Sequence, residues 1–397
     1  MNQSTRHPNP TRAVPSSGAS LALSLSTSTL LALSAVGLAG CPATMTNETP
    51  VDMTVSPTAD LAGTPNVDMA TVRPQQPGCS TSEWCWSYPL PQGNALWSVF
   101  TTSPTDGWAV GDSGTLLKIS GGQLQPLISP TRSTLYSVWG TDANNVFAVG
   151  DRATVLRWDG AKWAQLPITD NTGMSVKVSG LYSAWGAGRS DVWFAGADGV
   201  ILHWDGTSLT RTAVAGSGVS IWDVWGSGPR DVWATASNGI YRFDGTSWAL
   251  RQSTSDLATA VWGSSASDVW FATAGTSGFR WNGTALSTVS LPVAKLWALA
   301  GSSASDVWAV SDQGDVVRYN GTSWSRLTSP VKTFLVGISV QSASDVVISG
   351  WEGTILRWDG TALTKQASPV TKDLLGITRG FGATWITGSE GTLLRGD

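Results

Sequence analysis

Acidic side chains recur in one kind of turn along this chain, and carboxylates gathered at such a place could bind a cation, a sugar or a basic partner. Each turn joins a segment that carries a large aromatic residue to the next β-rich segment. Asp also favours such turns for a local reason, because its side chain bonds to nearby backbone groups. Both interpretations stay open. The acidic turn residues are Asp112, Asp151, Asp198, Asp312, Glu352 and Glu390.

Two irregular features are further candidates, since a symmetric scaffold gains function from its departures. Trp351 adds an aromatic ring to one of the acidic turns. The connection 169–179 is longer than its equivalents, and loops on a rigid scaffold commonly carry function. We predict that the acidic turn residues and Trp351 lie on one ligand-binding face.

A second polar pattern pairs an Asp with a cation in the following segment. Across a β-hairpin, Arg318 should lie beside Trp308 and diagonal to Asp306, within side-chain reach. We therefore predict an Asp–Arg–Trp brace in each repeat, and an exposed brace would contribute only about 0–1 kcal/mol. The repeated cations are Lys118, Arg157, His203, Arg242, Arg280, Arg318, Arg357 and Arg395. The repeated acids are Asp191, Asp231, Asp268, Asp306 and Asp345.

Few residues are available for catalysis or metal binding. The chain has two His, and His203 is one copy of the repeated cation, so a Ser/His/Asp set would depend on that residue. The three Cys cannot complete a tetrahedral metal site with the His available. The formal net charge is −4 without a basic patch, which argues against a nucleic-acid partner. We expect no catalytic residue, no metal and no cofactor.

The elements that position these side chains are repeats of about 40 residues. Six closing turns of the type Asn-Gly or Asp-Gly have their Gly at positions 160, 206, 245, 283, 321 and 360. Such dipeptides favour two-residue β-hairpins, because both central residues need positive φ. A period near 40 that contains strands instead of helices indicates a β-propeller.

One repeat contains four short strands, which make one propeller blade. We predict an all-β propeller of eight four-stranded antiparallel blades, or seven if one weak copy is irregular. The last copy stops at its hairpin, so we expect residues 84–90 to supply its fourth strand and close the ring from both termini. First strands are expected near Leu96, Leu135, Leu181, Ile221, Thr259, Leu296, Leu335 and Leu375.

The stretch Gly107-Trp108-Ala109-Val110-Gly111-Asp112-Ser113-Gly114-Thr115-Leu116-Leu117 resembles the repeats of photosystem-assembly-factor-like and Asp-box (BNR) propellers. The resemblance covers about residues 84–397. In the strict Asp-box, Ser-x-Asp-x-Gly-x-x-Trp, the aromatic residue lies closer to the turn Gly than it does here. In this chain Tyr319 follows Gly314 by five residues. The resemblance therefore implies the propeller architecture and does not extend to the chemistry of the sialidase members.

The N-terminal part has the features of an export signal and a tether. Within residues 1–40, the first part carries the basic residues Arg6 and Arg12, and an uncharged run rich in Leu, Ala, Ser and Thr follows. The run ends in Leu38-Ala39-Gly40-Cys41, which resembles the lipobox of bacterial lipoproteins. This resemblance implies cleavage before Cys41, lipid attachment to it and a place in the cell envelope; an ordinary signal peptide is the alternative. Because Pro42 is not Asp, we expect the outer membrane.

The remaining chain divides into a tether and a folded body. Residues 41–78 are rich in Thr and Pro without strand or helix periodicity, which predicts a disordered tether. Residues 79–397 form the propeller domain. Cys79 and Cys85 lie close together in an exported chain, so we predict a disulfide between them, with two free thiols as the alternative.

Two classes of function stay open. The first is a non-catalytic, envelope-anchored binding or assembly scaffold for a protein or carbohydrate ligand, and the second is a glycoside hydrolase of the sialidase-like kind. Such a hydrolase needs singular carboxylates that break the repeat, whereas Glu352 and Glu390 occupy repeat turns. We favour the binding scaffold, expect a monomer and expect membrane contact through the lipid anchor only. A purely structural envelope component is a third option.

Overall fold

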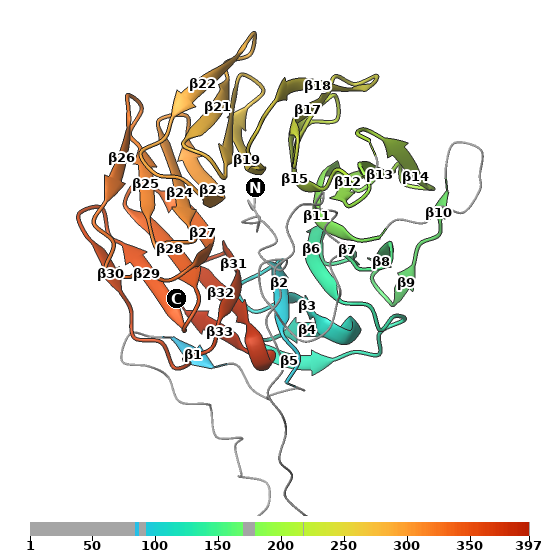
Figure 1. The fold of residues 1–397 in the computed structure, drawn as a ribbon. Helices are drawn as coiled ribbons and strands as arrows, with labels where there is room; N and C mark the ends of the chain where they lie inside the picture. Colours follow the sequence, from blue (N-terminus) through green and yellow to red (C-terminus); the bar gives the residue numbers. More distant parts are fainter. Residues whose placement is uncertain (1–83, 87–92, 170–178, 217, 397) are drawn as a thin grey trace, which may run out of the picture. The chain divides into compact units, whose positions relative to one another are not determined.

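The computed structural model describes residues 84–86, 93–169, 179–216 and 218–396. The strands are grouped into eight antiparallel sheets arranged around a common centre (Figure 1). In seven of the sheets the four main strands are consecutive in the sequence and run from the centre outward, and in the eighth the outer strand comes from the N-terminal side. The predicted eight-bladed all-β propeller is confirmed.

The strands of the first four blades have the following bounds. Blade 1 comprises β2 (Leu96–Thr101), β3 (Gly107–Gly111), β4 (Leu116–Ser120) and β5 (Gln123–Pro126). Blade 2 comprises β6 (Leu135–Asp142), β7 (Asn145–Gly150), β8 (Thr154–Trp158) and β9 (Trp163–Gln165). Blade 3 comprises β10 (Ile168–Thr169), β11 (Leu181–Gly188), β12 (Asp191–Gly196), β13 (Val200–Trp204) and β14 (Leu209–Ala213). Blade 4 comprises β15 (Ile221–Gly228), β16 (Asp231–Ala236), β17 (Gly239–Phe243) and β18 (Trp248–Ser253).

The other four blades follow the same order. Blade 5 comprises β19 (Ala258–Ser265), β20 (Asp268–Thr273), β21 (Ser277–Trp281) and β22 (Leu286–Ser290). Blade 6 comprises β23 (Leu296–Ser303), β24 (Asp306–Ser311), β25 (Val316–Tyr319) and β26 (Trp324–Leu327). Blade 7 comprises β27 (Leu335–Ser342), β28 (Asp345–Gly350), β29 (Thr354–Trp358) and β30 (Leu363–Lys365). Blade 8 comprises β31 (Leu374–Gly380), β32 (Ala383–Gly388), β33 (Leu393–Gly396) and β1 (Cys85–Trp86).

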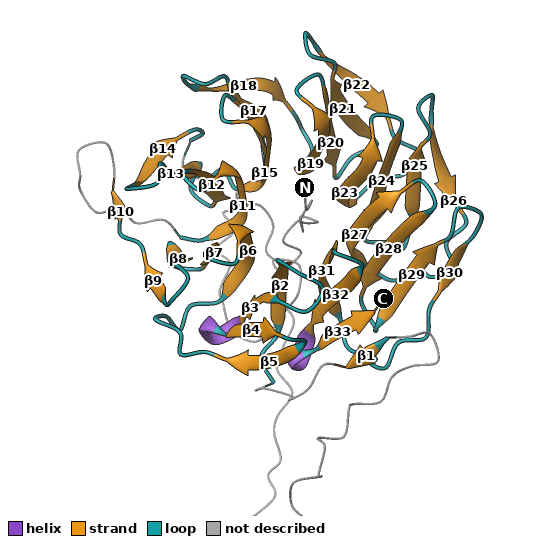
Figure 2. Cartoon of the chain, turned by 180° about the vertical axis from the view of Figure 1, so that it is seen from behind, coloured by secondary structure: helices purple, strands orange, loops and turns teal. Residues whose placement is uncertain are grey.

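Two first strands begin one residue earlier than expected, at Ala258 and Leu374. The described helical structure is limited to two short 3-10 turns, η3 (Asp112–Gly114) and η4 (Ser389–Gly391), drawn in purple in Figure 2. Both are turns between the second and third strands of a blade.

The ring closes through strands from both ends of the folded body, as expected. β1 pairs antiparallel with β33, with Cys85 opposite Arg395 and Trp86 opposite Leu394. The adjacent Trp84 is buried, and its ring lies close to Gly396. Residues 87–92 and Cys79 lie outside the described residues, so the far end of this segment and the disulfide stay predictions.

Aromatic side chains fill the space between neighbouring blades. Trp233 and Trp308 are completely buried. Trp233 of blade 4 contacts Trp281 of blade 5 with ring centroids 5.3 Å apart, and Trp308 of blade 6 contacts Trp358 of blade 7 at 5.5 Å. The repeated large rings are therefore core residues, and their burial holds adjacent sheets together.

The predicted brace, in which one Asp bonds both the Trp and the Arg, is complete in blades 5 and 6, and there it is buried instead of exposed. Oδ1 of Asp306 accepts hydrogen bonds from Trp308 Nε1 and Arg318 Nε, each at 2.9 Å. Asp306 is only 4% exposed. The guanidinium of Arg318 lies 4.9 Å from the Trp308 ring and 5.8 Å from the Trp358 ring of the next blade. The brace thus joins two blades, and its burial raises the cost of removing the carboxylate.

The brace varies around the ring. His203 takes the place of Arg in blade 3, where its Nε2 lies 2.6 Å from Asp191 Oδ1 and its ring stacks on Trp193. In blade 7, Asp345 pairs more closely with Arg379 of blade 8, at 2.8 Å, than with Arg357 of its own blade, at 3.9 Å. His203 is accordingly a structural residue of the repeat.

A fifth strand in blade 3 was not expected from the sequence. β10 pairs in parallel with the outer strand β14, with Ile168 opposite Leu209 and Thr169 opposite Thr210. β10 lies at the start of the connection 169–179, which the sequence shows to be longer than its equivalents in the other repeats. A segment of connecting chain therefore covers the outer edge of this blade.

Candidate functional site

The turns between second and third strands lie at one end of the sheets, together with the connections between blades. We call this end the turn face. The first backbone N–H of each turn donates to the carbonyl just before the first strand of its blade, as from Asp312 to Lys295, from Trp351 to Phe334 and from Ser389 to Asp373. This repeated bond fixes each turn against the connection that enters its blade.

The acidic turn residues occupy two different positions of the turn. The first residue of the turn is Asp112 in blade 1, Asp151 in blade 2 and Asp312 in blade 6. The backbone N–H of each makes the hydrogen bond described above. The second residue is in the left-handed region, with φ of 63° for Asp198, 56° for Glu352 and 54° for Glu390. The sequence pattern did not separate these two positions.

First-position carboxylates contact aromatic residues of the first strand. Trp97 Nε1 donates to Asp112 Oδ1 at 2.7 Å, and the Tyr136 hydroxyl donates to Asp151 Oδ2 at 2.9 Å. The rings of Trp97 and Tyr136 are themselves in edge contact across blades 1 and 2. These two carboxylates therefore have a structural role beside any ligand they bind.

The second-position acids differ in their partners. Asp198 accepts a hydrogen bond from the backbone N–H of Ser179, and Glu390 forms an ion pair with Lys372 at 2.7 Å. The side chain of Glu352 is exposed and makes no ion pair with another described residue. Of the predicted acids, Glu352 is the one whose charge is most available.

A hollow of about 690 Å³ opens on the turn face between blades 6 and 7. Three aromatic rings line it in sequence: Trp297 contacts Phe334 at 5.9 Å between centroids, and Phe334 contacts Trp351 at 5.1 Å. Three of the seven predicted ligand-binding residues meet here, namely Asp312, Trp351 and Glu352. The other four lie in blades 1, 2, 3 and 8 and do not line this hollow.

Charges of both signs surround the aromatic floor. Asp312 lies 3.6 Å from the ammonium of Lys295. Lys332 and Lys365 also line the hollow, are exposed and make no ion pair with the described part of the chain. The hollow therefore offers two free ammonium groups and the free carboxylate of Glu352.

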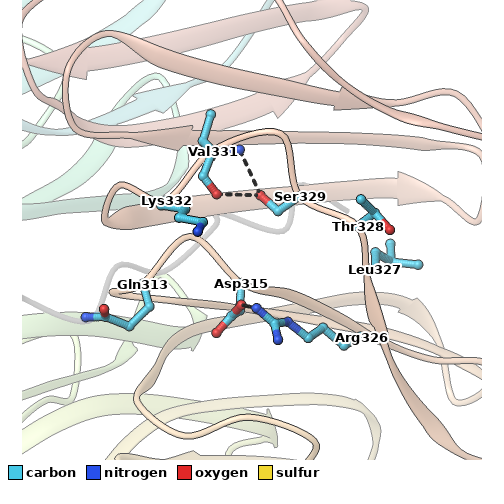
Figure 3. A pocket seen from close by; sticks show the side chains of 8 residues that line it. All are labelled: Gln313, Asp315, Arg326, Leu327, Thr328, Ser329, Val331 and Lys332. Carbon is cyan, nitrogen blue, oxygen red and sulfur yellow. Dashed lines mark hydrogen bonds and ion pairs between the residues drawn. The ribbon is translucent and has the colours of Figure 1, made fainter.

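A second hollow of about 550 Å³ adjoins the first (Figure 3). It is lined by the ion pair of Asp315 with Arg326 and by polar side chains of the connection between blades 6 and 7. Gln313, Val331 and Lys332 line both hollows. We call the two hollows together the blade 6–7 groove. It reaches from the first strands of the blades to the outer strand β26, an elongated form that suits an extended ligand.

Sequence reasoning missed Trp297, Phe334, Lys332 and Lys365. The signal for Phe334 was present, because it is the only aromatic among the described residues that directly precede a first strand. Its equivalents are Ala95, Thr134, Gly180, Ser220, Leu257, Lys295 and Asp373. Trp297 was hidden because blades 1 and 4 also carry Trp at this position, as Trp97 and Trp222.

Within the described ranges, no group of three or more His, Cys, Asp or Glu residues is arranged to hold a metal ion. No helix in this part of the chain is long and apolar enough to cross a membrane. Cys85 lies in β1, while Cys41 and Cys79 fall outside the described residues.

Comparisons with known proteins show the fold. No family model matches the chain, and no curated protein matches its sequence. The structure of YCF48 bound to D1 peptide aligns with a TM-score of 0.55 and 17% identity over 81% of this chain and 97% of that chain. Chaetomium thermophilum Sqt1 bound to the N-terminus of ribosomal protein L10 aligns with a TM-score of 0.65 and 12% identity, over 78% of this chain and 98% of that chain. The C-terminal WD40 domain of Sif2 aligns with a TM-score of 0.61 and 11% identity, over 77% of this chain and 97% of that chain.

These similarities establish the propeller fold. They do not by themselves assign a ligand, because one fold hosts many functions.

Proposed function

We propose that this protein is a non-catalytic binding scaffold that holds a polypeptide segment of another protein in the blade 6–7 groove. The observation that carries the proposal is the combination, in one elongated groove, of three touching aromatic rings with free charges of both signs. Aromatic side chains in a concave site are typical binding hot spots, and charged groups around them steer a partner and fix its orientation.

A polypeptide fits this groove better than a single sugar. The lining of the two hollows runs from the first strand β23 to the fourth strand β26 of blade 6, about 14 Å at about 4.8 Å per strand, which is the length of about four extended residues. A peptide also offers apolar, acidic and basic groups in sequence. Two of the similar propellers were solved with a peptide or with a protein N-terminus. Binding of an oligosaccharide, or turnover of a glycoside, are the alternative outcomes of the test below.

The test uses Trp351, which departs from the repeat. A peptide library selected against the purified chain supplies ligands, and calorimetry then compares the wild type with Trp351→Ser. Ser is the residue that blade 8 carries at this turn position, as Ser389, so the variant should fold. Because a buried aromatic anchor in a binding site contributes about 2 kcal/mol or more, we expect affinity to fall at least about tenfold.

The matched control is Asp151→Ser, the same turn position in blade 2, which should leave the affinity for the selected peptides unchanged. Equal affinity of the Trp351→Ser protein and the wild type would overturn the groove assignment. Selection of no peptide, together with binding on a glycan array, would replace the polypeptide ligand by a carbohydrate. Release of product from a fluorogenic glycoside would refute the non-catalytic assignment.

We also propose that the chain is anchored in the bacterial outer membrane through lipid attached to Cys41. The support is the sequence Leu38-Ala39-Gly40-Cys41, followed by a Thr- and Pro-rich segment before the propeller. Cys41→Ser should move the protein from the membrane fraction to the soluble fraction and abolish incorporation of labelled fatty acid. Unchanged fractionation and labelling would exclude this anchor.

A further inference from the structure

The outer strand of a propeller blade exposes one row of backbone groups, and natural proteins protect such edges from pairing with other chains. The protecting devices are charged residues, proline, bulges, shortness and coverage by another segment. Most outer strands of this ring carry at least one of them.

The devices differ from blade to blade. β5 ends in Pro126, β26 carries Arg326 and β30 carries Lys365. β18 carries Arg251 together with a shift of register against β17. β9 has three residues and β1 has two, while β14 is covered by β10.

Among the outer strands that the structure describes, β22 alone has none of these devices. It comprises the five residues Leu286-Ser287-Thr288-Val289-Ser290, without charge or proline. It pairs with β21 in regular register over its whole length. Thr and Val favour strands, so this edge combines β propensity with neutrality.

The outward-facing backbone groups of β22 follow from the hydrogen bonds at its two ends. Leu291 N–H donates inward to Thr276 at 2.8 Å, and the Ala285 carbonyl accepts inward from Asn282. Because directions alternate along a strand, Val289 and Ser287 also face β21. Leu286, Thr288 and Ser290 therefore direct their N–H and C=O groups away from the blade.

We propose that a second copy of this chain binds here, through antiparallel pairing of β22 with β22 about a two-fold axis at Thr288. In that arrangement Thr288 lies opposite Thr288, and Leu286 lies opposite Ser290 of the second copy. Each of the three outward N–H groups then meets an outward C=O of the other strand. The two edges satisfy each other completely, which is the property of a self-complementary two-fold interface.

The absence of charge selects β22 over the other edges for this pairing. The same two-fold pairing through the four-residue strand β26 would bring two copies of Arg326 near each other, and like charges across strands are unfavourable. In β22, Thr288 would face another Thr, a pair that is favourable across strands. β10 on β14 shows that the outer edge of a blade in this ring accepts an added strand.

The interface is small, because one five-residue strand buries far less than the roughly 1,000 Å² that a stable specific interface requires. We therefore expect a weak, transient dimer that forms only at high protein concentration. The expectation before the structure was a monomer, and the edge of β22 is the reason for departing from it.

The test is sedimentation equilibrium of the full-length chain over a concentration series, with Cys41→Ser as background so that lipid does not cause association. We expect the wild-type edge to give a reversible monomer–dimer equilibrium. Thr288→Lys should raise the dissociation constant at least about tenfold, because two like charges would meet at the axis. Thr288→Pro removes an outward N–H and should act in the same direction.

The matched control is Thr364→Lys, an exposed residue of the outer strand β30, which should leave the dimer intact. Thermal unfolding of each variant checks that the propeller is folded. If the Thr288→Pro protein does not fold, the Thr288→Lys protein still tests the proposal. A chain that stays monomeric to millimolar concentration would overturn the proposal. Equal dimerisation of the Thr288→Lys and Thr364→Lys proteins would also overturn it.

Discussion

The carboxylate of Asp306 joins three other side chains by hydrogen bonds. It accepts hydrogen bonds from the indole of Trp308, the guanidinium of Arg318 and the hydroxyl of Ser302. The sequence predicted the partners Arg318 and Trp308 from hairpin geometry. It did not predict the burial, because burial depends on the packing of the neighbouring blade against the same side chains. Trp351 could be identified because it adds an aromatic ring to a turn that is otherwise polar. Phe334 would have required a comparison of the residues that directly precede each first strand.

Asp306→Asn should lower the free energy of unfolding by about 1–3 kcal/mol, because it weakens charge-assisted hydrogen bonds in a buried place. Chemical denaturation measures the change. The control is Asp142→Asn, whose ion pair with Arg189 is more exposed and should contribute about 0–1 kcal/mol. Equal losses in the two variants would show that the burial of the brace has no energetic consequence.

The closing hairpins show an element that is determined locally. Asp359 Oδ1 accepts hydrogen bonds from the backbone N–H groups of Thr361 and Ala362 at 2.8 and 2.9 Å. Asn320 makes the same two bonds to Thr322 and Ser323 at 3.0 Å. The turn thus needs an acceptor and not a charge. Such local chemistry explains why the hairpins could be placed from sequence, whereas β10 could not, since its parallel pairing joins residues about 40 positions apart.

The same hairpins predict a dependence of stability on pH. Hydrogen bonds from Ala362 and Thr361 lower the pKa of Asp359 to about 2. A group whose pKa is lower in the folded state stabilises above its unfolded pKa, about 3.9, and loses that contribution as the pH falls through the folded pKa. Asp359→Asn should therefore remove part of the fall in melting temperature between about pH 4 and pH 2.

The reverse exchange is the control for this prediction. Asn320→Asp should add acid sensitivity in the same pH range, because the new carboxylate would accept the same backbone bonds. Melting temperatures recorded across the pH series measure both changes. If neither variant alters the slope, the carboxylates of the hairpins are not linked to folding.

At the scale of the whole molecule, the number of blades and the closing strand could be predicted from sequence. Both follow from the period and from a last repeat that lacks its fourth strand. The blade 6–7 groove could not be predicted in this way, because its members come from a first strand, two turns, a connection and an outer strand. Their meeting depends on how two blades stand side by side.

Ring closure itself can be tested at Trp84, which is 6% exposed and packs with Ile377 and Leu394 of blade 8 in one buried cluster. Trp84→Ala should lower the free energy of unfolding by about 3–5 kcal/mol, since it empties a buried site at the junction. Chemical denaturation measures the loss, and Ile128→Ala, at a residue that is 98% exposed, is the control with no expected change. A Trp84→Ala protein as stable as the control variant would show that the junction does not limit stability.

The pairing of β1 with β33 has a consequence for the order of events during synthesis. Among the described strands, β1 is made before all others and its partner β33 after all others. Until Leu393 and the residues after it are available for pairing, the final blade keeps an unsatisfied edge, and contacts so distant in sequence form slowly. A nascent chain that is interrupted late would thus retain almost every blade and still expose a strand that invites aggregation.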